Sequence, residues 1–286
     1  MDKPGFNLKE ANIALIGLGL MGGSLALSLK PRCRRLSAYD PDRATIELAR
    51  RQEIVHAADS DPAKILADAD LVILACPVPA IIEWLKRLPD YIQHPCIVLD
   101  IGSSKRTIVT ALESLPANFD PIGGHPICGR ERLSLENAER FLYRDAPFVL
   151  TPLPRTSEHA RSAALLIVEA LGARPIWLDA ESHDQILAST SHLPYLLASA
   201  LVLATPGDSA PLVGPGFRST SRLAGTSSSM MLGVLQANSD NVLTSIANFR
   251  HSLDILESAL QTNNKDALES ALDDSRQQYL SLIPAP

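Results

Sequence analysis

Short runs of aliphatic and β-branched residues alternate with helix-like stretches over the first 180 residues of the chain. Runs of this kind predict strands when helical segments separate them. The predicted strands are residues 12–16, 36–39, 71–75, 97–100, 119–122, 148–150 and 175–178. Strands that alternate with helices are typical of a doubly wound, mostly parallel sheet. The sequence therefore predicts an α/β fold, in which ligands bind beyond the carboxyl ends of the strands.

The pattern changes after about residue 180, where the strand signals stop. Helical periodicity then covers residues 181–204, 238–261 and 265–280, and glycines and prolines interrupt the loop between the first two helices. The first helix carries apolar residues on much of its circumference, more than one face of a small domain can cover. We therefore expect two domains, an α/β domain at 1–179 and an all-helical dimerisation domain at 180–286. A first helix buried within one subunit is the alternative.

The first predicted strand leads into a glycine loop and then a helix. Gly17 permits a tight turn, Gly19 allows the backbone to approach a pyrophosphate, and Gly22 lets the helix pack close to the strand. Leu20 and Met21 lie between the last two glycines, where the predicted helix Met21–Leu29 begins, and the N–H groups of its first turn attract phosphate. An ordinary glycine turn is the alternative interpretation. The flanking strand and helix favour a dinucleotide site in a Rossmann-like domain.

Asp40 ends the second predicted strand, about 20 residues after the glycine loop. A carboxylate at this position accepts hydrogen bonds from ribose hydroxyls and repels a 2′-phosphate, which favours NAD over NADP. Arg43 could face such a phosphate or could be a solvated residue at a helix start. Cys76 and Pro77 follow the third predicted strand at the same sheet edge, and we assign them to the cofactor site as well.

A histidine follows the fifth predicted strand. His125, between Gly124 and Pro126, is a candidate general base because histidine titrates near the working pH of most enzymes. His192 lies in the first helix of the second domain and faces a cleft only if that helix lines it. The other histidines are interpreted as surface residues: His56, His94, His159, His183 and His251.

Arg218 and Arg222 lie four residues apart and would share one face of a helix. A guanidinium group binds a carboxylate through two parallel hydrogen bonds. Both arginines are therefore candidate clamps for an acidic substrate, and a solvated basic face is the alternative.

Composition narrows the choice of partner. The net charge of −6 over 286 residues gives no basic patch for nucleic acid or an anionic membrane, so we expect a small-molecule substrate. The four cysteines form no CxxC pair, which predicts reduced thiols and no metal site. The N-terminus lacks the features of a signal peptide, and the apolar run 193–204 is too short to span a bilayer. We therefore expect a cytoplasmic protein without a membrane segment.

Several motifs together resemble those of the prephenate and arogenate dehydrogenase (TyrA) family. They occur in the family's order: Gly17–Ala26, Ser103-x-Lys105, Gly123-Gly-His-Pro-Ile, Ala146–Pro152, Ser191-His-Leu-Pro194 and Gly216-Phe-Arg-x-Thr-x-Arg222. The resemblance spans nearly the whole chain. It implies a Rossmann-like domain, a helical domain that forms a homodimer, and an active site between the two domains.

The resemblance also implies roles for individual residues. His125 accepts a hydrogen bond from the ring hydroxyl of the substrate, and Ser103 supports it. Arg222 binds a substrate carboxylate, and His192 occupies an active-site position. In the implied reaction a hydride leaves C4 of the ring for the nicotinamide, the ring carboxylate departs as CO2, and aromatisation drives the step. This chemistry requires no metal.

The chain departs from the family pattern at three positions. Arg130 replaces a small hydroxyl residue expected to line the substrate pocket, Ser219 stands where aspartate is frequent, and Tyr195 where a second histidine is frequent. These changes leave the choice between prephenate and arogenate open. Two other functions compete: a hydroxyacid-type dehydrogenase, although that class uses a lysine where this chain has His192, and an NAD-binding sensor without turnover.

Overall fold

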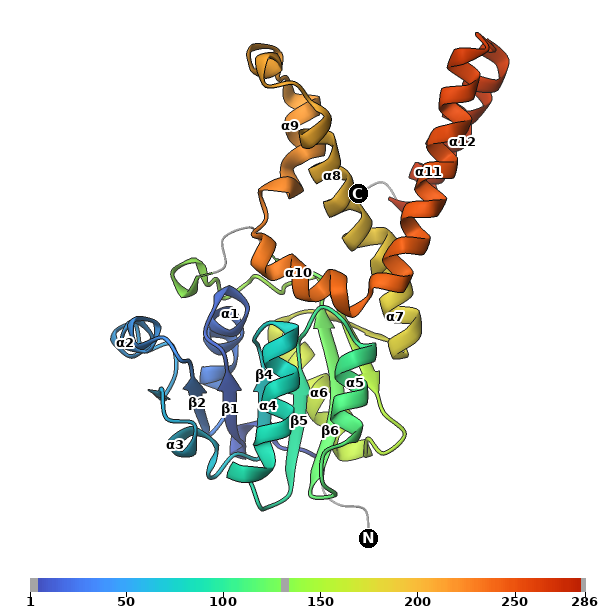
Figure 1. Cartoon of the computed structure of the whole chain (residues 1–286). Coiled ribbons are helices and arrows are strands. Elements are labelled where there is room, and N and C mark those ends of the chain that lie inside the picture. Colours follow the sequence, from blue (N-terminus) through green and yellow to red (C-terminus); the bar gives the residue numbers. More distant parts are fainter. Residues whose placement is uncertain (1–4, 130–133, 284–286) are drawn as a thin grey trace. The chain divides into compact units, whose positions relative to one another are not determined.

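A computed structural model of the chain describes residues 5–129 and 134–283 (Figure 1). It separates into two compact units, one ending at Asn238 and the other beginning at Ser239. The first unit contains an eight-stranded sheet in the order β3-β2-β1-β4-β5-β6-β7-β8. Its strands are β1 (Asn12–Ile16), β2 (Arg35–Tyr39), β3 (Ala57–Asp59), β4 (Leu71–Leu74), β5 (Cys96–Asp100), β6 (Phe119–Pro126), β7 (Pro147–Pro152) and β8 (Arg174–Trp177).

The sheet confirms the predicted doubly wound, mostly parallel α/β fold. Every neighbouring pair is parallel except β6 and β7, which run antiparallel. Each of the seven predicted strands is present. The hydrophobic pattern missed the edge strand β3, because its three residues, Ala-Ala-Asp, form no aliphatic or β-branched run.

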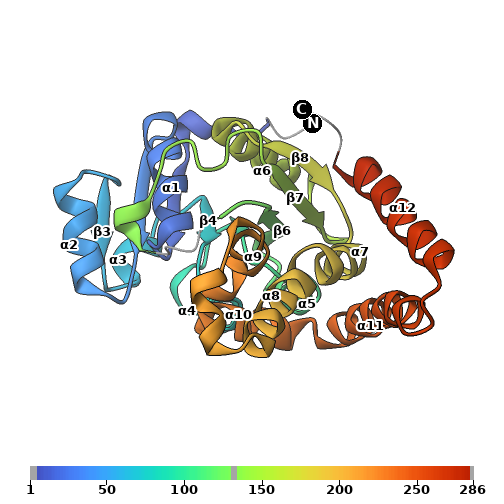
Figure 2. The ribbon, with the colours of Figure 1, turned by 90° about the horizontal axis from the view of Figure 1, so that it is seen from above.

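Helices cover both faces of the sheet, and neighbouring strand residues face opposite layers. Ile13 and Leu15 pack with α1, α2 and α6, whereas Ala14 and Ile16 pack with α3, α4 and α5. Figure 2 shows α1 and α6 on one side of the sheet and α4 and α5 on the other. The helices are α1 (Leu20–Leu29), α2 (Arg43–Arg51), α3 (Ala63–Leu66), α4 (Val78–Tyr91), α5 (Arg106–Glu113) and α6 (Glu158–Leu171).

A set of helices follows the sheet and lies beyond the carboxyl ends of its strands (Figure 1). It consists of α7 (Ala180–Leu187), a π-helical turn (Ala188–His192), α8 (Leu193–Ala204), α9 (Pro215–Ser221) and α10 (Ser228–Ala237). The sequence pattern predicted a loop where α9 and α10 form. The Gly214-Pro215 pair that indicated a break is the start of α9, since proline is well suited to the first turn of a helix.

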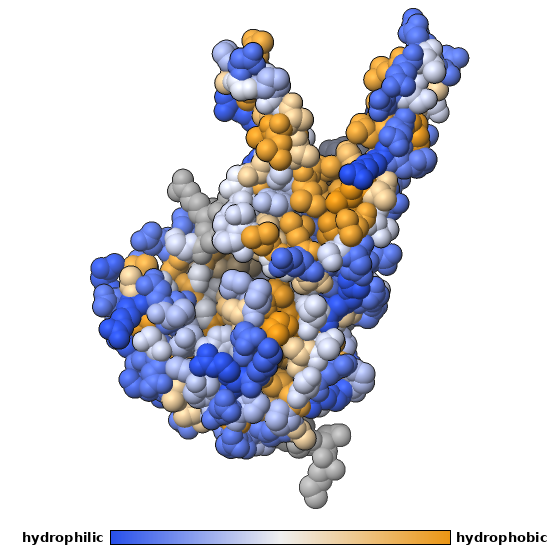
Figure 3. Space-filling view, in the orientation of Figure 1, coloured by the Kyte–Doolittle hydropathy of each residue, from blue (hydrophilic) through white to orange (hydrophobic). Residues whose placement is uncertain are grey.

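The stretch Ala180–Ala204 is continuously helical over 25 residues, and an 18-residue window within it has a mean hydropathy of 1.5. By length and composition alone this helix could cross a membrane, because it extends the apolar run 193–204 toward its N-terminus. Its polar residues His183, Asp184 and His192 are buried within the protein. The apolar residues of α8 are mostly not buried, and Leu203 is 87% exposed. Figure 3 shows apolar side chains along the projecting α8–α9 arm.

The second unit is a hairpin of two helices, α11 (Ser239–Gln261) and α12 (Lys265–Leu282). Asn264 is the N-cap of α12, and its side chain accepts a hydrogen bond from the amide of Ala267 at 3.0 Å. Large apolar side chains are exposed along both helices: Leu243, Leu253, Ile255, Leu260, Leu272, Tyr279, Leu280 and Leu282. Exposure on this scale is typical of a surface that another chain covers.

A buried ion pair joins the carboxyl end of β5 to β6. The Lys105 ammonium group contacts the Asp100 carboxylate, and both side chains have no exposed surface. Lys105 also donates a hydrogen bond to the carbonyl oxygen of Gly124 at 2.6 Å. If one partner of such a pair is lost, the other charge stays buried without compensation.

We therefore expect Lys105→Met to lower the free energy of unfolding by about 3–5 kcal/mol. Urea denaturation followed by tryptophan fluorescence measures this change in the first unit, which holds both tryptophans, Trp84 and Trp177. The control is Lys86→Met, which removes an ion pair with Glu83 whose two side chains are each 65% exposed. A midpoint shift no larger than that of the control would contradict the role of Lys105.

Candidate active site

The glycine loop has the geometry of a phosphate cradle. Gly17 has a φ of +100°, and a Cβ atom there would lie 2.6 Å from the carbonyl oxygen of Ala75. A Cβ atom on Gly22 would lie 2.0 Å from the carbonyl oxygen of Gly17. Gly19 begins α1 without a side-chain cap, so the first amides of this helix are available to an anion. Side chains larger than hydrogen would close this cradle.

A cavity of about 440 Å³ lies over the loop. Of the predicted cofactor residues, Gly22 lies outside its lining and the others line it: Gly17, Gly19, Leu20, Met21, Asp40, Cys76 and Pro77. Burial raises the pKa of the Cys76 thiol to about 12, so this side chain is neutral at the cavity wall. The glycine cradle, the carboxylate of Asp40 and the cavity that they line together fit a dinucleotide.

The Asp40 carboxylate is held by two backbone amides. Oδ2 accepts a hydrogen bond from Leu18 at 2.8 Å, and Oδ1 accepts one from Asp42 at 3.0 Å. Each oxygen keeps a second acceptor position for a ligand hydroxyl. Two further residues that the sequence pattern did not indicate, Trp84 and Arg87, line the cavity wall. The Arg87 guanidinium group lies 4.5 Å above the Trp84 ring, a surface on which an aromatic base can pack.

A second cavity of about 430 Å³ adjoins the first. Four residues predicted for catalysis or substrate binding line it: Ser103, His125, His192 and Arg222. Ser103 also lines the first cavity, as do Leu20, Met21 and Ile101. The structure thus brings residues from β6, α7–α8 and the segment before α10 around one space that continues into the dinucleotide cavity.

His125 belongs to β6, which extends to Pro126, and it pairs with Val149 of β7. The sequence pattern ended this strand at residue 122 and placed the histidine in a loop. Strand pairing gives the His125 backbone a fixed position. Burial, together with His183, Lys105 and His192 nearby, holds the pKa of its imidazole well below the usual 6.5. The ring is therefore neutral near pH 7.

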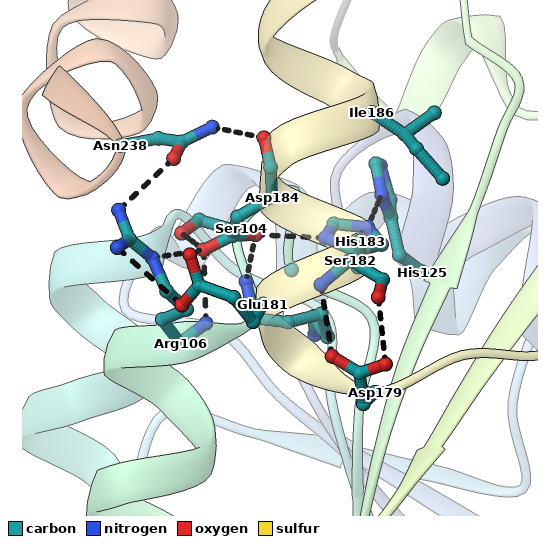
Figure 4. Close-up of polar contacts among 12 residues, drawn as sticks. Ser104, Arg106, His125, Asp179, Glu181, Ser182, His183, Asp184, Ile186 and Asn238 are labelled. Carbon is teal, nitrogen blue, oxygen red and sulfur yellow. Dashed lines mark hydrogen bonds and ion pairs between the residues drawn. The ribbon is translucent and has the colours of Figure 1, made fainter. Parts of the chain in front are cut away.

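His183 was expected on the surface, and this expectation was wrong. Its side chain is fully buried, with Nε2 at 2.8 Å from Nδ1 of His125 and Nδ1 at 2.7 Å from Oδ1 of Asp184 (Figure 4). His183 lies on α7, whose N-cap is Asp179, and the carboxylate of Asp179 accepts a hydrogen bond from the amide of Ser182. The cluster depends on tertiary packing, which the local sequence around His183 does not reveal.

The Asp184 carboxylate is surrounded by donors from the β5–α5 turn. Oδ1 accepts the amide of Lys105 at 2.7 Å, and Oδ2 accepts the amide of Arg106 at 2.9 Å and the hydroxyl of Ser104 at 3.1 Å. Burial raises the pKa of this carboxyl group, but the hydrogen bonds from His183 and the two amides more than offset that effect and lower it. Asp184 is therefore ionised near pH 7.

His192 is 1% exposed, and burial lowers the pKa of its ring to about 4. The side-chain amide of Asn238 lies 3.3 Å from Nδ1 of His192 and donates to the carbonyl oxygen of Asp184 at 2.6 Å. With Nδ1 facing an amide donor, a neutral His192 carries its proton on Nε2. It can therefore donate a hydrogen bond to a ligand in the cavity that it lines.

The three predicted arginines have different positions. Arg222 begins a short 3-10 turn, Arg222–Gly225, and lines the second cavity. Arg218 lies exposed on α9, outside the residues that line this cavity. Arg130 lies outside the described residues. Of the other departures from the family pattern, Tyr195 lines the cavity and Ser219 is exposed.

Two family models match the chain. The model described as "Prephenate dehydrogenase, nucleotide-binding domain" matches residues 25–177. The model described as "Prephenate dehydrogenase, dimerization domain" matches residues 179–274.

Individual relatives span nearly the whole chain. Prephenate dehydrogenase of Lactococcus lactis subsp. cremoris is 31% identical over 274 residues, which cover 92% of this chain and 75% of the relative. Prephenate dehydrogenase from A. aeolicus, solved in complex with hydroxyphenyl propionate and NAD+, has a TM-score of 0.88 at 27% identity and covers 97% of this chain and 100% of its own. Synechocystis arogenate dehydrogenase has a TM-score of 0.81 at 28% identity, and the match covers 95% of this chain and 99% of the Synechocystis chain.

The buried neutral histidines predict how stability depends on pH. Below about pH 6.5 an unfolded histidine takes up a proton. In the folded chain His192 stays neutral down to about pH 4, and His125 stays neutral well below pH 6.5. The free energy of unfolding is therefore highest above pH 6.5. It falls as the pH drops below 6.5, by up to about 1.4 kcal/mol per pH unit for each histidine.

Urea midpoints measured between pH 7 and pH 4.5 test this dependence. The double variant His125→Gln/His192→Gln should lose most of the slope. An equal slope in the parent and the double variant would show that other groups cause it.

Proposed function

Because the chain belongs to the prephenate dehydrogenase family, we propose that it oxidises and decarboxylates prephenate, arogenate or both, with NAD as the hydride acceptor. The observation that carries this proposal is the meeting of two cavities at Ser103, with the dinucleotide cradle on one side and His125, His192 and Arg222 on the other. The enzyme is an oxidoreductase of tyrosine biosynthesis.

NAD fits the first cavity. The N-terminus of α1 would hold the pyrophosphate, and Asp40 would accept hydrogen bonds from the ribose. When bound, NAD supplies the acceptor for the hydride that leaves C4 of the substrate ring. Since Asp40 would repel a 2′-phosphate, we propose that NAD is preferred over NADP.

The residues of the second cavity have separate roles in this proposal. Nδ1 of His125 is engaged with His183, which leaves Nε2 to accept the proton of the substrate's ring hydroxyl. Arg222 would bind a substrate carboxylate through its guanidinium group, and His192 would donate a hydrogen bond. Ser103, at the junction of the two cavities, would orient the hydroxyl and the nicotinamide next to each other.

We propose that residues 180–286 act as the helical, substrate-binding and dimerisation domain. The exposed apolar residues of α8, α11 and α12 support a homodimer, because water-exposed rows of this kind are normally covered by another chain. A homodimer would cover part of the apolar stretch Ala180–Ala204, and we propose a cytoplasmic enzyme without a membrane span. The net charge of −6 supports the proposal that it has no nucleic-acid partner.

Family membership disfavours the hydroxyacid-type dehydrogenase, which was one of the two competing functions. The other, an NAD-binding sensor without turnover, is tested directly. Nicotinamide reduction is followed by absorbance with prephenate and with arogenate, each against NAD and NADP. We expect turnover with NAD and at least one substrate. NAD binding without reduction in any of the four combinations would overturn the proposed function.

The first variant concerns the proton acceptor. His125→Asn should lower kcat by two to four orders of magnitude, the usual contribution of general acid–base catalysis, while NAD still binds. Steady-state kinetics and NAD titration measure the two effects. Turnover near that of the parent would remove His125 from this role.

Arg222→Ala should weaken substrate binding through the loss of a charge-assisted pair. A loss of about 2 kcal/mol corresponds to a KM about 30-fold higher. Arg51→Ala, on the exposed end of α2, is the control. Arg218→Ala, measured in parallel, decides whether that second arginine also binds the substrate. An unchanged KM in Arg222→Ala would contradict the assignment.

Asp40→Ser should relax the preference for NAD, because it removes the charge that repels a 2′-phosphate. The ratio of kcat/KM with NAD to that with NADP measures the preference. Since Asp40 also accepts the amides of Leu18 and Asp42, a moderate loss of stability should accompany the change. A variant as strict as the parent would show that other residues discriminate between the cofactors.

A further inference from the structure

We propose that His183 and Asp184 are positioning residues for His125, which fix the position of its proton and store the substrate's hydroxyl proton during turnover. This inference rests on the proposed function. The three groups form one hydrogen-bonded row from the second cavity into the interior, His125–His183–Asp184, with distances of 2.8 and 2.7 Å (Figure 4). His183 and Asp184 have no exposed surface.

Asp184, at the inner end of the row, determines which atom donates and which accepts in each of its hydrogen bonds. Three donors from the β5–α5 turn, the Lys105 and Arg106 amides and the Ser104 hydroxyl, point at the Asp184 carboxylate. Such a group is an acceptor, and the Nδ1 atom of His183, 2.7 Å from Oδ1, must therefore carry a proton. A neutral His183 then has a lone pair on Nε2.

The same reasoning continues to the cavity. Since Nε2 of His183 is an acceptor and lies 2.8 Å from Nδ1 of His125, Nδ1 must carry the proton. A neutral His125 therefore has a lone pair on Nε2, the atom that remains for the substrate. The opposite arrangement would bring two lone pairs or two N–H groups face to face at 2.8 Å. Asp184 thus selects the form of His125 that can accept a proton, without contacting the substrate itself.

The charged and titratable groups around the row are consistent with this direction. Lys105 and His192 lie near His125, and both disfavour a positive charge on its ring. At the inner end, the Arg106 guanidinium group lies 3.5 Å from Oδ2 of Asp184 and 3.6 Å from Glu181. The carboxylate of the row thus lies against His183, with Oδ1 of Asp184 2.7 Å from Nδ1 of His183.

The row can take up one proton and return it. As the hydride leaves, the hydroxyl proton moves to Nε2 of His125, and the O–H electron pair forms the ring carbonyl. The Nδ1 proton of His125 then moves to Nε2 of His183, which becomes an imidazolium paired with Asp184. After CO2 departs, the electrons of the broken C–C bond aromatise the ring, and the ring oxygen takes the proton back through His125. No proton is gained or lost overall, and burial of His183 separates the stored proton from water.

Kinetics of two His183 variants test the positioning role. His183→Phe keeps a flat ring but removes the acceptor, so kcat should fall by about 10- to 100-fold, a typical effect for a residue that orients a catalytic group. The KM for the substrate and the affinity for NAD should be unchanged. His183→Gln, whose carbonyl oxygen can accept the Nδ1 proton, should recover part of kcat. His94→Phe, which replaces a partly buried histidine outside the row, is the control.

Nitrogen-15 NMR of the histidine rings, recorded on the whole enzyme without substrate, gives a readout independent of turnover. His125 should carry its proton on Nδ1 and have a bare Nε2, and His183 should carry its proton on Nδ1. In His183→Gln the His125 proton should stay on Nδ1, whereas in His183→Phe it should divide between the two nitrogens.

The outcomes separate this inference from the proposed function. If the parent reduces NAD with neither substrate, the proposed function fails, yet the NMR spectra still test the proton positions. An active parent with a proton on Nε2 of His125 would overturn the inference. Full kcat in His183→Phe would overturn it as well. Should His183→Phe not fold, the spectra of the parent and the kinetics of His183→Gln decide the question.

Discussion

The arrangement of the site depends on the hydrogen bonds that the carboxylate of Asp184 accepts. It accepts hydrogen bonds from three groups of the β5–α5 turn and from the ring of His183, so it ties helix α7 to the carboxyl edge of the sheet. Because the turn also carries Ser103 and Lys105, the same contact sets the distance between the junction of the two cavities and the histidines. The same hydrogen bonds therefore determine both the geometry of the site and the packing of α7 onto the sheet.

Much of the fold could be predicted from the sequence because parallel strands buried on both faces leave a simple mark, an uninterrupted apolar run. The strands β4 and β5 have such a run. The other five predicted strands were found from shorter or interrupted apolar runs. The strand Ala57–Asp59 has no such run and depends on its neighbour β2. The helices α9 and α10 were read as a loop because glycine and proline mark the start of a helix as well as its interruption.

Site residues were predictable where the fold itself places them. The predicted cofactor residues follow the strand ends, and the glycine spacing has a local physical cause, so the position of Gly17, Gly19 and Asp40 around one cavity could be predicted from the chain alone. The position of His183 could not, because it depends on burial and on a contact with a residue 58 positions away. A histidine followed by an aspartate near the start of a helix was the available signal, but it is too common to be informative. Arg218 and Arg222 lie four residues apart, but Arg222 lines the second cavity and Arg218 does not.

The π-helical turn at Ala188–His192 lies between α7 and α8, and it changes the direction in which the side chains of α8 point relative to those of α7. Pro194 has no N–H group to donate to the preceding turn, and the amide of Leu193 reaches back five residues to the carbonyl oxygen of Ala188. The turn thus holds one residue more than an α-helix would need. Loss of a single residue there would return the chain to α-helical winding and rotate everything beyond it by about 100° relative to His183. A one-residue deletion, harmless in most surface loops, would here turn Tyr195 and the rest of α8 away from the histidine row. The contacts of this cavity therefore depend on the number of residues in the turn as well as on their side chains.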